Sequence, residues 1–199
     1  MKRHSFGIAA ALISGLCLAQ PSATAPEQLV VKAVTEKKVQ QLPSGPLYWR
    51  IENFPTLAQA QAVVGSYSLA AEVSGKVWLF TLGPAGGSTP GGSKVVEIGP
   101  VPPLSAPEYL LRINRSGGAP GAKTSVHTHP GSEAFYVLTG RISQETPVGV
   151  GHAEAGMAMN GRGPDTPMRV SSSGTSDLNA LVMFVVDATR PFSSPAKLP

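Results

Sequence analysis

Two histidines and a glutamate lie close together in the segment SVHTHPGSEAFYV. His127 and His129 are two residues apart, so in an extended segment both side chains point to the same face. A Pro-Gly-Ser turn then precedes Glu133, and this turn would bring one carboxylate back beside two imidazoles. Two neutral imidazoles and one carboxylate on one side of an ion form the facial set of non-haem Fe(II), and Mn, Ni, Cu and Zn accept the same ligands. The segment predicts a divalent transition-metal site with open coordination positions.

The spacing around these residues resembles the first signature motif of the cupin family. Gly121 is followed after five residues by His127, after one by His129, after three by Glu133 and after six by Gly140. The resemblance implies a small jelly-roll β-barrel that holds a metal near its mouth, with His127, His129 and Glu133 as three of four ligands. It also implies a small-molecule ligand, and it permits dioxygenases, isomerases and lyases without selecting among them.

The second motif of that family is degraded in this chain. Its best alignment is AGMAMNGRGPDTPMRVSS, in which Met168 stands where the family usually has a fourth histidine. Two interpretations of Met168 stay open: a soft thioether ligand, which would favour copper, or an apolar plug beside a three-ligand site.

Three further polar residues are candidates for contact with a ligand. His152 lies between the two motifs, where it is either a surface residue or a substitute fourth ligand or proton shuttle. Arg162 and Asp165 lie in the loop before Met168, as ligand contacts or as exposed solubilising charges. No residue is assigned a catalytic role.

Composition and local signals favour strands as the elements that position these residues. Gly 22 and Pro 19 make up about a fifth of 199 residues, which favours short strands and turns over long helices. Residues 57–63 predict one short helix, with Thr56 as its cap and Gly65 as its stop, and Ser74-Gly75 predicts a hairpin turn. Runs of apolar and β-branched residues between turn residues predict strands at 47–51, 68–73, 76–82, 94–98, 108–114, 123–129, 134–139, 141–146, 167–171 and 180–187.

The first 25 residues predict a secretory signal peptide. A basic start is followed by an apolar run of about 14 residues, which is shorter than the roughly 20 residues of a spanning helix. Cleavage between Ala19 and Ala25 removes Cys17, the one cysteine, and leaves 14 of the 16 basic residues against 12 acidic ones. The sequence therefore predicts a periplasmic or extracellular protein without disulfides, without a membrane anchor after processing and without a nucleic-acid-binding face.

The predicted architecture is an all-β, cupin-type jelly-roll barrel with an N-terminal strand extension and one short helix. The chain divides into a signal peptide (1–25), a β extension that packs on the barrel (26–104), the barrel (105–190) and a C-terminal tail (191–199). An extended arm at residues 27–41 would offer an edge to a second copy, so a homodimer is a hypothesis. The predicted function is that of an exported metal-binding cupin, either a dioxygenase-like oxidoreductase or, as the alternative, a non-catalytic protein that binds a small molecule or a metal.

Overall fold

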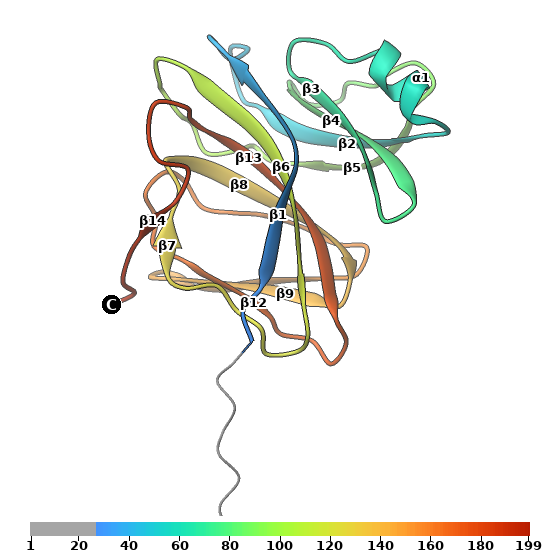
Figure 1. The fold of residues 1–199 in the computed structure, drawn as a ribbon. Coiled ribbons are helices and arrows are strands. Elements are labelled where there is room, and N and C mark those ends of the chain that lie inside the picture. Colours follow the sequence, from blue (N-terminus) through green and yellow to red (C-terminus); the bar gives the residue numbers. More distant parts are fainter. Residues whose placement is uncertain (1–26) are drawn as a thin grey trace, which may run out of the picture.

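The computed structural model describes residues 27–199 and contains fourteen strands and one short helix in that range (Figure 1). The elements are β1 (Val30–Val39), β2 (Tyr48–Phe54), α1 (Leu57–Ala62), β3 (Ser68–Val73), β4 (Lys76–Gly83), β5 (Ser93–Ile98), β6 (Tyr109–Gly118), β7 (His127–Thr128), β8 (Gly131–Thr139), β9 (Arg141–Thr146), β10 (Gly149–Glu154), β11 (Ala158–Asn160), β12 (Arg169–Ser172), β13 (Leu178–Asp187) and β14 (Ser194–Pro195). The all-β prediction is confirmed. The predicted signal peptide and its cleavage positions lie outside the described residues, and no helix within residues 27–199 has the length and hydropathy of a membrane span.

Four antiparallel sheets build the fold. The largest has the strand order β1-β6-β13-β8-β11, and the others are β10-β9-β12, β14-β7 and β3-β4-β2-β5. β2 to β5 and α1 form the upper right part of Figure 1, whereas the other strands form the barrel beside them. The predicted N-terminal arm is β1, which pairs with β6 of the same chain along its length.

The central strand β13 explains how the sheets stack. Its sequence, LNALVMFVVD, is apolar at almost every position, which is typical of a strand buried on both faces. Leu181, Met183 and Val185 face the four-stranded sheet, whereas Val182 and Phe184 face the barrel interior. The five-stranded sheet is therefore the middle layer between two hydrophobic cores.

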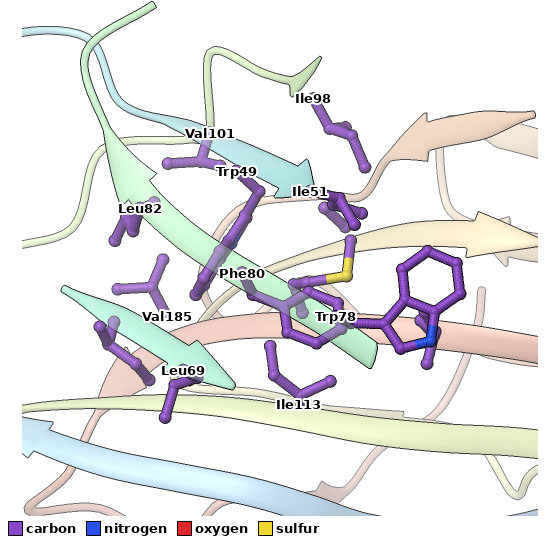
Figure 2. Close-up of a cluster of buried hydrophobic side chains, with 14 of the residues drawn as sticks. Trp49, Ile51, Leu69, Trp78, Phe80, Leu82, Ile98, Val101, Ile113 and Val185 are labelled. Atoms are coloured by element: carbon purple, nitrogen blue, oxygen red, sulfur yellow. The ribbon is translucent and has the colours of Figure 1, made fainter. Parts of the chain in front are cut away.

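The first core lies between the five-stranded and four-stranded sheets (Figure 2). Trp49, Trp78 and Phe80 are its largest fully buried side chains, and the Trp78 and Phe80 rings stack with their centroids 6.5 Å apart. Ile113 and Val185 reach this cluster from the middle sheet. Full burial of an aromatic or aliphatic side chain contributes about 1.5–3 kcal/mol, so this core fixes the N-terminal sheet on the barrel.

The second core fills the barrel between the middle sheet and the sheet β10-β9-β12. Phe135, Val137 and Phe184 pack there against Ile142 and Val170 from the opposite sheet. Glu133 belongs to the same face of β8 as Phe135 and Val137, because side chains alternate along a strand. The fold therefore directs the Glu133 carboxyl into the barrel.

Local predictions in the N-terminal half are mostly confirmed. The Thr56 hydroxyl accepts a hydrogen bond from the Gln59 amide and caps α1, and Ser74 and Gly75 have φ angles of 54° and 71° in the β3–β4 hairpin turn. The prediction of Gly65 as the helix stop is wrong, since α1 ends at Ala62 and Val63 caps it.

Two strands around the site are shorter than predicted, and three strands are not predicted at all. Only His127 and Thr128 form a strand within the predicted range 123–129, and the strand predicted at 167–171 begins at Arg169. Three strands were not predicted: β10, which contains two glycines, the three-residue β11 and β14, which contains a proline. Each is weak in intrinsic β-propensity, and each is held by its partner strand.

Candidate functional site

A cavity of about 500 Å³ opens inside the barrel and gathers the predicted ligands. Its wall includes His127, His129 and Glu133. Most of the remaining wall is apolar, with contributions from Leu29, Val126, Phe135, Val182, Phe184 and Phe192. The structure thus brings the three residues of the first motif to one open, mostly apolar cavity.

The backbone around the two histidines is held by the segment that contains Met168. The His127 amide donates to the Met168 carbonyl at 3.0 Å, and the Met168 amide donates back to the His127 carbonyl at 2.8 Å. The Asp165 amide donates to the His129 carbonyl at 2.8 Å. The two imidazole rings meet edge to face with centroids 4.9 Å apart, on the same side of the chain as their spacing predicts.

Backbone carbonyls orient both imidazole rings. His127 Nδ1 lies 2.8 Å from the Ser125 carbonyl oxygen, and His129 Nδ1 lies 2.6 Å from that of Phe192. A carbonyl can only accept, so each neutral ring carries its proton on Nδ1 and leaves the lone pair on Nε2. This is the tautomer that a metal-ligating histidine adopts when a backbone carbonyl fixes it.

His129 is held in its neutral form by its surroundings. Only 5% of its surface is exposed, and its ring packs against Phe184 and Phe192 with centroids 4.9 and 4.7 Å away. Burial lowers the pKa of His129 to about 4, against the opposing effect of the Phe192 carbonyl. The Nε2 lone pair of His129 is therefore available at neutral pH.

Glu133 is the most strongly perturbed carboxyl of the site. It is 3% exposed, and its Oε1 accepts a hydrogen bond from Gln144 Nε2. Burial raises the pKa of Glu133 to about 8, and the Gln144 hydrogen bond opposes this only in part. Without a nearby positive charge, the carboxyl is protonated at neutral pH.

Met168 lies beside this carboxyl as part of a small buried group. It is 1% exposed, and Gln144 Nε2 lies 3.3 Å from its sulfur while also donating to Glu133. Met168 is not part of the cavity wall. Gln144 was missed in the sequence, although Ile142, Gln144 and Thr146 alternate as buried positions on β9 and a polar residue at such a position is a usable signal.

The glycines of the first motif have conformational reasons for their positions. Gly121 and Gly140 have φ angles of 89° and 74°, which favour glycine. A Cβ on Gly140 would also lie 2.7 Å from the Asp177 carbonyl oxygen. Gly161 approaches Glu133 so closely that a Cβ there would lie 2.6 Å from Glu133 Cγ.

The histidine pair fits a transition metal, whereas the complete three-residue set is not assembled. Both rings keep Nε2 free of backbone partners, which suits a ligand. Within residues 27–199, however, no three His, Cys, Asp or Glu side chains lie close enough to one another to hold an ion. Glu133 instead accepts a hydrogen bond from Gln144. Of the three predicted ligands, His127 and His129 therefore have a geometry that suits a transition metal.

The other three sequence candidates lie away from the cavity wall. His152 is exposed on β10, opposite Ser143 of β9, and Arg162 is exposed in the loop after β11. Asp165 is exposed and pairs with Arg190 at 2.7 and 3.0 Å, and the hydrogen bond from Arg190 lowers the pKa of Asp165. None of the three lines the cavity with His127 and His129.

Several solved structures are similar to part of this chain. The sequence matches no family model and no curated protein. Among solved structures, a cupin-like protein from Thermotoga maritima is 15% identical over 44% of this chain and 65% of its own, with a TM-score of 0.39. The DMSP lyase DddQ from Ruegeria pomeroyi is 16% identical over 43% of each chain, with a TM-score of 0.37. The polyketide cyclase RemF from Streptomyces resistomycificus is 21% identical over 45% of this chain and 62% of its own, with a TM-score of 0.36.

In each of these three comparisons the match spans less than two thirds of the other protein. At these identities the similarity concerns the fold alone.

Proposed function

We propose that this chain is an exported β-barrel protein that binds a small molecule beside His127, His129 and Glu133, with a divalent transition metal held by these side chains. The observation that carries the proposal is the position of all three on the wall of one cavity of about 500 Å³. A volume of this size, with apolar walls and a few convergent polar groups, is typical of small-molecule sites.

The residues of the chain have distinct parts in this proposal. The Ser125 and Phe192 carbonyls hold the rings of His127 and His129 so that Nε2 is the ligand atom. Glu133 would give up the proton that burial keeps on it, because a carboxyl must be ionised to bind a metal. When bound, such an ion polarises a substrate oxygen or activates dioxygen, which suits a dioxygenase, an isomerase or a lyase.

The alternative function is capture of a small molecule or a metal without turnover, and one observation favours it. Apart from the two histidines and Glu133, no titratable side chain of the described residues lines the cavity. Acid–base catalysis would therefore depend on these three groups, and a metal would occupy them. Met168, in the position of the fourth ligand, agrees with this alternative.

Elemental analysis of the purified protein tests the metal. We expect about one transition-metal ion per chain, its loss in His127→Ala and His129→Ala, and a lower thermal midpoint after chelator treatment, since an ion bound only by the folded state stabilises it. Ser172→Ala is a matched control, because Ser172 is buried in the same barrel and its hydroxyl has no partner. Full metal occupancy in His127→Ala would refute the assignment.

The mass of the mature protein tests export. We expect the protein recovered from the periplasm or the medium to begin between residues 20 and 26, because the small residues from Ala19 to Ala25 follow the apolar run. The same chain with a charged residue in the middle of that run is the control, and it should stay unprocessed inside the cell. An exported chain that retains Met1 would contradict the prediction.

A further inference from the structure

Two polar side chains of β6 lie on the cavity wall together with the histidines and Glu133. Asn114 and Ser116 of β6 are 1% and 5% exposed, and both line the cavity. Arg112 Nε donates to Asn114 Oδ1 at 2.9 Å, so the oxygen of this amide already has a partner. Within residues 27–199, Asn114 Nδ2 and Ser116 Oγ make no side-chain hydrogen bond, and both residues face the open cavity.

The strand register places these two residues relative to Glu133. Asn114 lies opposite Val182 of β13, and Val182 lies opposite Phe135 of β8. Glu133 of β8 lies opposite Phe184, which is two residues after Val182 on the same face of β13. Asn114 and Glu133 are therefore on the two strands that flank β13. The Cα atoms of Asn114 and Glu133 are roughly 10–12 Å apart, because they are separated by two inter-strand spacings and by two residues along the strand direction.

The chemistry of this patch is that of a hydrogen-bond donor. An amide whose oxygen is occupied offers only its N–H groups, and a serine hydroxyl can donate as well. Donors that face an open cavity are hydrated, and a ligand oxygen that replaces the water gains about 0.5–1.5 kcal/mol net for each hydrogen bond. The surface between the patch and the histidines is made of Val182, Phe184 and Phe135, which suits an apolar body.

We propose that Asn114 and Ser116 form a second recognition point, which binds a carbonyl or other acceptor oxygen at one end of an apolar ligand. This inference rests on the proposed function, since it names the class of molecule that the same cavity takes. The ligand is then about as long as a naphthalene with one short substituent, because it must span the roughly 10–12 Å between Asn114 and Glu133 across β13. Asn114 and Ser116 are specificity residues in this proposal.

Two matched probes separate the acceptor oxygen from the apolar body. 2-Acetylnaphthalene carries a carbonyl, and 2-ethylnaphthalene has nearly the same shape without an acceptor. Equilibrium dialysis measures the affinity of each probe. We expect wild-type protein to bind the ketone about tenfold more tightly than the hydrocarbon, because one or two neutral hydrogen bonds contribute about this much.

Variants show whether the patch carries this preference. Asn114→Leu with Ser116→Ala should reduce ketone affinity about tenfold and leave hydrocarbon affinity within about twofold. Ser116→Ala alone should show part of this loss and leaves the Arg112–Asn114 hydrogen bond in place. Ser172→Ala, a buried serine outside the cavity wall, should keep the wild-type preference.

The outcomes distinguish this inference from the function on which it rests. A ketone preference that survives in folded variants would overturn the role of Asn114 and Ser116 while leaving the cavity as a binding site. Equal affinity for both probes in wild-type protein would do the same. If neither probe binds wild-type protein, both this inference and small-molecule binding by the cavity are overturned, whereas metal content in the same samples tests the histidines separately.

Discussion

Glu133 is the residue in which burial and proposed chemistry meet most directly. It is 3% exposed, it has Gln144 as its partner, and burial keeps the nearby His129 ring neutral at neutral pH. A buried carboxyl in such a place either keeps its proton or gains a cation. The proposed metal would supply that cation, and without it Glu133 behaves as a buried acid.

The pH dependence of stability in the metal-free protein follows from the two pKa shifts. Glu133 rises from 4.5 to about 8, so its contribution is present below pH 4.5 and is lost as the pH rises toward 8. His129 falls from 6.5 to about 4, so its contribution is present above pH 6.5 and is lost as the pH falls toward 4. Between pH 4.5 and 6.5 the two effects oppose each other. We therefore expect the free energy of unfolding in urea, after chelator treatment, to be highest in this interval, to decrease above pH 6.5 because of Glu133 and to decrease below pH 4.5 because of His129.

Glu133→Gln provides the comparison for this pH profile. The amide keeps the shape of the side chain without its ionisation, so the decrease in stability between pH 6.5 and 8 should become much smaller. A variant that loses stability as steeply as wild-type protein over this interval would show that another group causes the decrease.

At the scale of elements, the C-terminal segment forms part of the site. β14 pairs with β7, the Ala196 amide donates to the Val126 carbonyl, and Arg190 pairs with Asp165. The Phe192 ring also lies under the Arg112 guanidinium, 4.4 Å from its centroid. These contacts hold the Phe192 carbonyl against His129 Nδ1.

Deletion of residues 190–199 should therefore weaken metal binding. The change removes the acceptor that orients His129, and loss of such a partner typically costs about 10–100-fold in metal affinity. Metal titration of the truncated, folded chain measures the effect. Deletion of residues 197–199 alone is the control, because it leaves β14 and the Ala196 amide in place. Equal affinities of the two deletions would contradict the orienting role of Phe192.

Whether an element could be predicted depended on how local its signal was. The Thr56 cap, the Ser74-Gly75 turn and the long apolar β13 each have a pattern within a few residues, and the structure contains all three. β14 and the loop that replaces most of the predicted strand 123–129 depend on partners far along the chain.

The same distinction applies to the residues of the site. The spacing of His127, His129 and Glu133 is a local pattern, and all three lie on the cavity wall. The other residues of the site are brought there by pairing between distant strands, which no local pattern indicates: Gln144, Asn114, Ser116 and Phe192.

For the whole molecule, the two tryptophans provide a test of cooperativity. Trp49 and Trp78 are the only tryptophans of the chain, and both are buried in the core between the four-stranded and middle sheets. Because β13 contributes to both cores, we expect the N-terminal sheet and the barrel to unfold together. Tryptophan fluorescence and far-ultraviolet circular dichroism should give coincident urea transitions, and an earlier fluorescence transition would show that the N-terminal sheet separates first.

The two apolar faces of β13 also have a consequence for how the chain folds. A strand with one polar face is held in register by solvent, since a slip of one residue would expose its apolar side chains. β13 lacks this safeguard, because a slip would only exchange Ala180 and Val182 with Leu181 and Met183 between two mostly apolar interiors. Its correct pairing depends on the fit of Ala180, Val182 and Phe184 to the barrel and of Leu181, Met183 and Val185 to the tryptophan core, and on the irregularity between Asn179 and Ala180 opposite β8. The strand that joins the two cores is thus also the one most exposed to kinetic trapping during refolding.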